Sequence, residues 1–298
     1  MRPDDWHFTE DLDEFLARAG DFLRSRPALH TTQLTTLEKM RTRGTAAFGT
    51  GPVLFGLLEA AGEVRAALYR LPSQRVVLTP LSPEQADVLA GRLTDLGRTV
   101  AGVLADHDTA TGFAEAWQRH TGAAAVHGWR GRLHRLGTLT PPEPVPAGRG
   151  RPVEEREHEH LMAWCREFAA DVGESVAITA GTWTGTRFAE KSYTYWEDPD
   201  GTPVSMAGAN PLVGGQVRID PVYTPARLRG RGYAGAVTVA VTRAALTAGA
   251  TDVVLFTDPA NLTSNALYRR LGYLPYADFT RYDLALPHAA GLPARGDG

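Results

Sequence analysis

The sequence Arg229-Gly230-Arg231-Gly232-Tyr233-Ala234 lies at the centre of the stretch that decides the fold, residues 217–273. A strand is predicted before this loop, at 215–223, and an alanine- and valine-rich helix is predicted directly after it, at 232–248. Glycines let the backbone approach a ligand closely, and the first N–H groups of a helix have no partner inside the helix. These N–H groups, the positive end of the helix dipole and the two arginines favour a bound phosphate. We therefore expect the loop to hold a pyrophosphate.

The same loop contains the spacing Gly230-x-Gly232-x-x-Gly235, which is typical of nicotinamide-dinucleotide sites. Such a site requires a strand that runs directly into the first glycine, whereas Pro225 and Arg227 lie between strand and loop here. Further strands should also follow the acid Asp258, and only about forty residues remain after it. Because the glycine spacing fits but these two requirements are not met, an NAD(P)-binding protein is only an alternative interpretation.

A short polar helix is predicted after the next strand. Asn261, Ser264, Asn265 and Tyr268 fall on one face at helical spacing, and Gly272 is a suitable helix end. A purely structural helix does not need a polar stripe that ends in a phenol. Two interpretations remain: the loop upstream favours Tyr268 as an active-site group, and the alternative is a core tyrosine whose hydroxyl is satisfied.

Together these motifs resemble the cofactor core of the GNAT N-acetyltransferase superfamily. The pattern Arg/Gln-x-x-Gly-x-Gly/Ala is present as Arg229, Gly232 and Ala234, and the pattern Asn…Leu-Tyr-x-x-x-Gly-Tyr/Phe as Asn261, Leu267-Tyr268, Gly272 and Tyr273. A helix and a strand separate the two motifs, in the order of the family. The resemblance covers the last third of the chain closely and the rest by element order.

The resemblance implies an enzyme that transfers an acetyl group directly from acetyl-CoA to an amine of a small molecule. The residues that it places around the cofactor are Val222, Tyr223, Thr224, Arg229, Gly230, Arg231, Gly232, Tyr233, Ala234, Asn261, Ser264, Asn265 and Tyr268. Backbone groups of the strand would pair with the pantetheine arm, and Tyr268 would protonate the departing thiolate. Asp220 is the favoured catalytic base because it borders the cofactor strand, with Glu174 and Glu197 as further candidates; the alternative for Asp220 is a surface or turn carboxylate. A non-catalytic CoA-binding or regulatory module, including a self-protection module, is the alternative function.

Composition limits the partners. The net charge is −3, so nothing indicates nucleic acid or an anionic membrane, and no apolar run approaches membrane-spanning length. Cys165 is the only cysteine, which excludes internal disulfides and cysteine-based zinc sites, and the acidic run 154–160 lacks metal-ligand spacing. The N-terminus lacks the apolar segment of a secretory signal. We expect a cytoplasmic monomer or homodimer without a metal.

The chain is predicted to be α/β (α+β), with two GNAT-like domains that each contain a mixed, mostly antiparallel sheet flanked by helices. The predicted parts are a degenerate copy at 1–140, a proline-rich linker at 141–152, a catalytic copy at 153–286 and a flexible tail at 287–298. At the loop position the first copy reads Thr79-Pro80-Leu81-Ser82-Pro83, without glycine or arginine. An unrelated α/β first domain remains an alternative.

Periodicity and turn signals predict the remaining elements. Helices are expected at 11–26, 32–43, 83–96, 111–120, 153–172 and 182–191, and strands at 53–58, 63–71, 75–79, 99–104, 192–197, 202–209 and 252–257. The aromatic residues of the segment 172–198, Trp183, Tyr193, Tyr195 and Trp196, are candidate walls of an acceptor pocket or part of the core.

Overall fold

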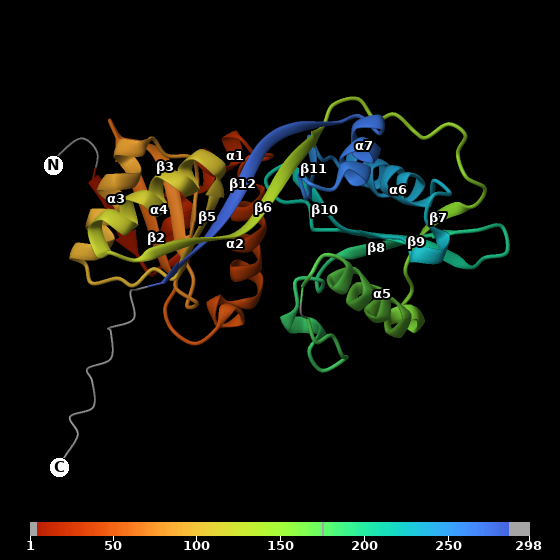
Figure 1. Cartoon of the computed structure of the whole chain (residues 1–298), viewed down its shortest axis with the longest axis horizontal. Coiled ribbons are helices and arrows are strands. Elements are labelled where there is room, and N and C mark those ends of the chain that lie inside the picture. The colour runs from red at the N-terminus through yellow and green to blue at the C-terminus, as the bar shows by residue number, and fades with distance from the viewer. Residues whose placement is uncertain (1–4, 175, 286–298) are drawn as a thin grey trace, which may run out of the picture. The chain divides into compact units, whose positions relative to one another are not determined.

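The computed structural model describes residues 5–174 and 176–285, which divide into two compact units (Figure 1). Unit 1 consists of Met1–Phe22, Arg43–Gly131 and Asp278–Gly298, and unit 2 consists of Leu23–Thr42 and Arg132–Ala277. The tail predicted at 287–298 lies outside the described residues. Within the described part of the chain, no helix has the length and apolar character needed to cross a membrane.

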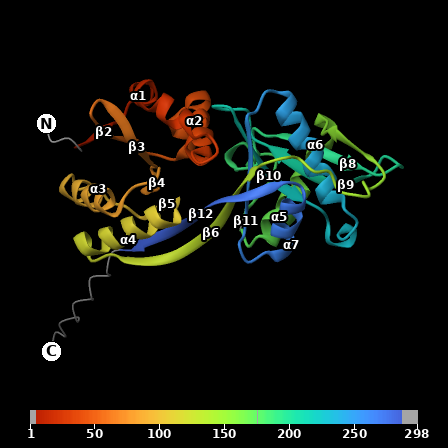
Figure 2. The same ribbon diagram turned by 90° about the horizontal axis from the view of Figure 1, so that it is seen from above.

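Unit 1 is a mixed sheet with helices on both faces. Its strands follow the order β1 (Asp5–Thr9), β2 (Leu54–Ala60), β3 (Glu63–Arg70), β4 (Arg75–Leu78), β5 (Gly102–Asp106), the last part of β12 (Tyr273–Ala285) and the first part of β6 (Ala124–Leu136). Strands β4 and β5 pair in parallel, with Val76 opposite Val103. Helices α3 (Pro83–Asp95) and α4 (His107–Thr121) pack on one face, and α1 (Leu12–Ser25) covers the other, where Phe15 stacks on Phe55 at 4.9 Å (Figure 2). A 3-10 turn, η1 (Thr45–Phe48), precedes β2.

Unit 2 repeats this plan. Its strand order is the last part of β6, β11 (Asp252–Thr257), β10 (Gln216–Tyr223), β9 (Pro203–Ala209), β8 (Ser192–Glu197) and β7 (Arg149–Pro152). Strands β10 and β11 pair in parallel, whereas the pairs β11–β6, β10–β9, β9–β8 and β8–β7 are antiparallel. Helices α6 (Tyr233–Thr247) and α7 (Leu262–Arg270) pack on one face, and α5 (His158–Asp171) packs on the other. The turns η2 (Glu155–Glu157), η3 (Trp183–Gly185) and η4 (Ala226–Leu228) lie in its loops.

Helix α2 (Thr31–Arg43) and the end of β6 belong to unit 2, although they come from the first half of the sequence. The buried hydroxyl of Thr31 donates to Oε1 of Gln216 at 2.9 Å, which joins α2 to the first residue of β10. In the same way, residues 132–135 of β6 pair with β11, and residues 279–283 of β12 pair with β5 in unit 1. Each unit is thus completed by a strand from the other half of the sequence. The predicted domain bounds 1–140, 141–152 and 153–286 describe two consecutive copies in the sequence, and they remain a prediction.

Most predicted elements are present, and the main error is a helix. The segment predicted as a helix at 182–191 contains only η3, because Gly185 and the three β-branched threonines disfavour a helix. Thr182 strengthens the loop instead: its hydroxyl accepts from the N–H of Thr179 at 2.9 Å and donates to the carbonyl of Ala177 at 3.0 Å. The strands β1 and β7 were also not predicted. Cys165 is fully buried, and burial raises the pKa of its thiol to about 12.

Candidate active site

The parallel pair in unit 2 separates at the predicted site. The register of β10 and β11 runs from Gln216 opposite Asp252 to Ile219 opposite Leu255 and, among the described residues, does not continue. Strand β10 continues to Tyr223, and its pairing with β9 shifts register between Ile219 and Val222. Such a shift bends a strand. The edge of β10 at 220–223 is therefore left open on the side of β11, and an extended ligand could pair with it as an added strand.

Helix α6 begins beside this edge with its N–H groups open. Gly232 is the N-cap residue at φ 82°, has no capping side chain, and its carbonyl accepts the first helical hydrogen bond, from Ala236 N–H at 3.1 Å. The preceding Gly230 also has a left-handed backbone, at φ 77°, which favours glycine. The N–H groups of the first helical turn, from Tyr233 onward, thus have no partner within the helix and can bind an anion.

The corresponding helix of unit 1 satisfies its own first turn. At the start of α3, the Ser82 hydroxyl accepts from the N–H of Gln85, and the Gln85 side chain accepts from the N–H of Ser82 at 2.9 Å. Pro83 removes a further donor, and Glu84 places a negative charge in the first turn. This helix start cannot serve as an anion site in the way that α6 can, which agrees with a degenerate first copy.

The two arginines of the loop are exposed. The Nε of Arg229 donates to the carbonyl of Thr224 at 3.0 Å, and its guanidinium forms an ion pair with Asp171 of α5. Arg231 extends from the exposed turn between the two left-handed glycines. Since the side chains of Arg229 and Asp171 are 52% and 46% exposed, their attraction is weak, and a pyrophosphate can take the place of Asp171.

The polar residues of α7 and its N-cap have different roles: Asn261 caps the helix, Asn265 joins it to β11, and Ser264 is partly exposed. Asn261 caps the helix by accepting from the N–H of Ser264 at 3.0 Å, and Ser264 itself is partly exposed. The buried amide of Asn265 donates to the carbonyls of Asp258 and Asn261, and its oxygen accepts from the Thr257 hydroxyl at 2.9 Å. These bonds use the whole amide group, so Asn265 fixes α7 on β11.

Tyr268 lies one turn beyond Asn265 and is 9% exposed. Its ring meets that of Tyr273 edge to face at a centroid distance of 6.1 Å. Among the described residues, no group forms a hydrogen bond with the Tyr268 hydroxyl. Burial, and to a smaller extent the charge of Asp220, raises the pKa of Tyr268 above its ordinary value. The phenol therefore stays protonated at neutral pH and can donate a proton.

Asp220 is held by two cations on the α5 side of β10, whereas Tyr268 packs on the α6 and α7 side. Its carboxylate contacts Nη1 of Arg187 at 2.7 Å and Nζ of Lys191 at 2.5 Å, and the Lys191 side chain is only 3% exposed. Burial raises the pKa of Asp220, but Lys191 and Arg187 together lower it far below the usual carboxyl range. A carboxylate with a lowered pKa is a weak proton acceptor, so this geometry favours a positioning role for Asp220 over a basic one.

The other two acidic candidates are also paired with arginine. Glu174 accepts from Nε of Arg187 at 2.8 Å, and the buried Glu197 accepts from Nε of Arg151 at 2.5 Å. Sequence reasoning missed the partners of all three acids. Asp220, Arg187 and Lys191 form a charged cluster. The sequence contained one sign of it, because Lys191 is one of only two lysines in a chain whose other basic residues are arginines and histidines.

Replacing Asp220 by asparagine is expected to lower the free energy of unfolding by about 3 kcal/mol, because it leaves the buried ammonium of Lys191 without a counter-charge. The folded-state pKa of Asp220 is depressed, so its contribution is complete above the unfolded carboxyl pKa of about 4 and is lost as the pH falls below that value. Urea unfolding of both proteins at several pH values measures the difference. Asp200→Asn, at an exposed turn, is the control and should cost little. An Asp220→Asn protein as stable as the parent at pH 7 would contradict this interpretation.

A hollow of about 650 Å³ lies beside the charged cluster, within unit 2. Its lining consists of Val176, Ala177, Gly181, Thr182, Thr184, Gly185, Thr186 and Arg187. Arg187 connects the hollow to β10 through Asp220. The aromatic residues Tyr193, Tyr195 and Trp196, considered as acceptor-pocket walls, are core residues at 7%, 0% and 8% exposure. The lining combines three threonines and Arg187 with the apolar side chains of Val176 and Ala177.

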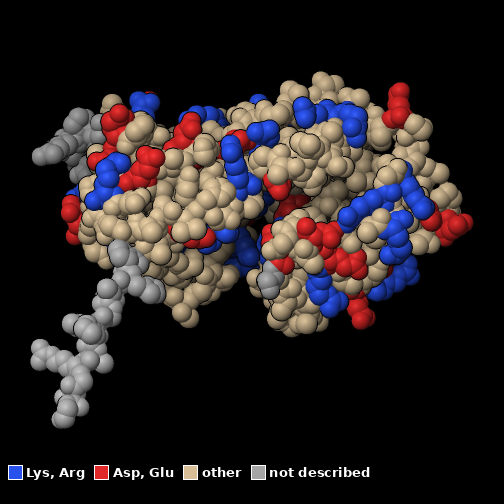
Figure 3. All heavy atoms as spheres, viewed as in Figure 1, with Lys and Arg blue, Asp and Glu red and all other residues tan. Residues whose placement is uncertain are grey.

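One face of the molecule carries side chains of both charges. Acidic and basic side chains are interspersed over the face shown in Figure 3, in agreement with a net charge of −3.

Residues 154–273 match the model of the acetyltransferase (GNAT) family, and this segment is a GNAT domain, as its motifs predicted. The mixed sheet of unit 2 differs from the parallel sheet that a nicotinamide-dinucleotide site would need. No curated protein matches the sequence.

Solved structures with the same fold cover nearly the whole chain. A GCN5-related N-acetyltransferase from Sphaerobacter thermophilus has a TM-score of 0.62 at 16% identity, with 98% of each chain covered. A tandem GNAT protein from the clavulanic acid biosynthesis pathway has a TM-score of 0.57 at 13% identity, with 95% of this chain and 99% of that chain covered. A GCN5-related N-acetyltransferase from Kribbella flavida has a TM-score of 0.50 at 20% identity, over 86% and 97% of the two chains. The predicted fold of two GNAT-like domains is confirmed.

Proposed function

We propose that this chain is an N-acetyltransferase that transfers the acetyl group of acetyl-CoA directly to an amine of a small molecule. The observation that carries the proposal is the placement of three features in one unit. These are the open edge of β10 at 220–223, the uncapped N–H groups at the start of α6 and the protonated phenol of Tyr268. A protein that only binds phosphate at a helix start would not need the open edge of β10 or the phenol of Tyr268.

Each feature suits one part of the thioester. The edge of β10, including Val222 and Tyr223, offers backbone groups to the amides of the pantetheine arm, and the loop 229–234 offers N–H groups and arginines to the pyrophosphate. Thr224 supports the loop, since its carbonyl accepts from Arg229. Asn261 and Asn265 hold α7 so that Tyr268 is fixed in place. The residues therefore fit the cofactor that the motifs imply.

The reaction forms a nitrogen–carbon bond and breaks the carbon–sulfur bond of the thioester. The amine loses a proton to solvent, and the sulfur receives a proton from the Tyr268 hydroxyl, which solvent then restores. The hollow lined by Thr182, Thr186 and Arg187 is the proposed acceptor site, because Arg187 reaches β10 through Asp220. Asp220 keeps this wall in place as a positioning residue.

The function is tested by incubating the full-length protein with acetyl-CoA and a panel of primary amines, and measuring the release of free thiol. We expect release that depends on the amine and exceeds the hydrolysis seen without it. A protein that binds CoA but releases no thiol with any amine would favour the alternative, a non-catalytic CoA-binding module. A protein that binds no CoA would contradict both functions.

A further inference from the structure

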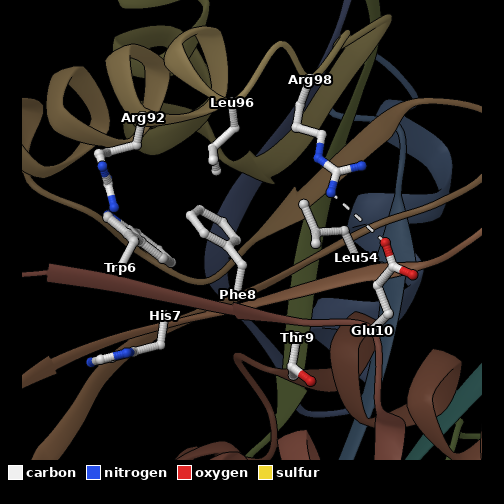
Figure 4. A pocket seen from close by; sticks show the side chains of 9 residues that line it. All are labelled: Trp6, His7, Phe8, Thr9, Glu10, Leu54, Arg92, Leu96 and Arg98. Carbon is white, nitrogen blue, oxygen red and sulfur yellow. Dashed lines mark ion pairs between the residues drawn. The ribbon is translucent and has the colours of Figure 1, made fainter.

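Unit 1 contains a hollow of about 440 Å³ that plays no part in the proposed reaction (Figure 4). It lies between strand β1 and the C-terminal end of α3. Its lining consists of Trp6, His7, Phe8, Thr9, Glu10, Leu54, Arg92, Leu96 and Arg98. In Figure 4 the side chains of Trp6 and Phe8 point toward Leu96 and the arginines, whereas His7 and Thr9 point to the other side of β1.

The floor of this hollow is aromatic. The rings of Trp6 and Phe8 are nearly parallel, with 16° between their planes and 6.3 Å between their centroids. Leu54 extends the apolar surface, and Leu96, 47% exposed, stands at its rim. Trp6 is 3% exposed, and its buried indole N–H has no hydrogen-bond acceptor among the described residues. A buried donor without an acceptor is unfavourable, and a ligand oxygen could satisfy it.

The opposite wall is cationic. Arg98 and Arg92 both line the hollow, and the ion pair of Arg98 with Glu10 is long, at 3.8 Å, between side chains that are 39% and 53% exposed. Burial, and then the positive charge of Arg98, lowers the pKa of the neighbouring Arg70. Positive charges therefore lie close together here. A carboxylate at ordinary hydrogen-bond distance would interact more strongly with Arg98 than Glu10 does.

We propose that this hollow is a binding site for a small aromatic carboxylate. The ring lies against Phe8 and the exposed edge of Trp6, and the carboxylate faces Arg98, which stands on the side of the hollow away from Arg92 (Figure 4). A ligand with one or two rings suits the volume. An inorganic anion would make no contact with the aromatic side chains, and a neutral aromatic compound would make no use of the charge of Arg98. The site is independent of the acetyl transfer proposed for unit 2.

The test compares three probes on the unaltered full-length protein by ligand-observed NMR titration: benzoate, the neutral isostere benzamide, and cyclohexanecarboxylate, which lacks the aromatic ring. We expect benzoate to bind about tenfold or more tightly than benzamide, because benzamide lacks the charge-assisted hydrogen bonds. Cyclohexanecarboxylate should also bind more weakly than benzoate. Equal affinities for benzoate and benzamide, or no detectable benzoate binding, would overturn the proposal.

Two variants locate the site. Arg98→Gln should weaken benzoate binding by about tenfold or more, whereas the matched control Arg65→Gln, an exposed arginine on β3 outside the hollow, should not change it. Binding that survives Arg98→Gln in a folded protein would place benzoate elsewhere and contradict the assignment. The comparison of probes needs no variant, so the proposal is tested even if a substitution prevents folding.

Discussion

Replacing Tyr268 by phenylalanine is expected to lower kcat for acetyl transfer by about 10²–10⁴-fold and to leave the Kd for CoA nearly unchanged. The substitution removes one oxygen from a buried ring whose hydroxyl has no hydrogen-bond partner among the described residues, so packing is kept. The departing thiolate then leaves without a proton donor. Thiol release under saturating acetyl-CoA and amine, together with calorimetric titration of CoA, measures both constants.

Tyr273→Phe is the matched control for this experiment. Tyr273 belongs to the same aromatic pair and is fully buried, but its hydroxyl bonds to Thr242 at 2.6 Å. Its removal should cost about 1 kcal/mol of stability and leave kcat within about threefold of the parent. Because the pKa of Tyr268 is raised, kcat should not fall on the alkaline side until above the ordinary tyrosine pKa of about 10. A Tyr268→Phe protein with unchanged kcat would remove Tyr268 from the mechanism.

A fragment that begins at residue 141 is expected not to fold into a CoA-binding protein. Unit 2 would lose α2, whose Thr31 bonds to Gln216, and the end of β6, which pairs with β11 over residues 132–135. The buried side chains of Leu133 and His134 would be lost with that strand, and the edge of β11 would be exposed. Thermal unfolding followed by circular dichroism should show no cooperative transition for the fragment.

Cleavage of the folded full-length chain provides the control. Val145 is 56% exposed in the proline-rich segment, so a protease site placed there can be cut while both pieces are present. The cleaved protein retains every strand and should bind CoA as the intact chain does. A fragment 141–298 that unfolds cooperatively and binds CoA with the affinity of the full chain would show that the exchanged strand and α2 are dispensable.

The sequence motifs indicated the backbone conformation of the glycine loop, but they did not indicate the partners of the acidic candidates. The backbone conformations of Gly230 and Gly232 follow from local chemistry, since left-handed turns favour glycine, and both positions have this conformation. The role of Asp220 depends instead on Arg187 and Lys191, which lie 33 and 29 positions away in the chain. Spacing along a strand could not show that these cations lower the pKa of the carboxylate.

Local sequence patterns also could not predict which strands pair with β6 and β12. The partners of β6 and β12 are set by pairings over more than a hundred positions, such as Leu255 with His134 and Phe279 with Asp106. The predicted helix at 182–191 failed for a local reason, because threonine side chains compete for the backbone groups that a helix would use.

The central claim is that the glycine-capped start of α6 binds the pyrophosphate of CoA, and calorimetric titration of the full-length chain with CoA tests it most directly. We predict one CoA per chain, because α3 of unit 1 satisfies its own first turn. We also predict that Arg229→Gln/Arg231→Gln weakens binding by about tenfold or more. No heat of binding, two equal sites per chain, or an unchanged Kd in the double variant would contradict the account.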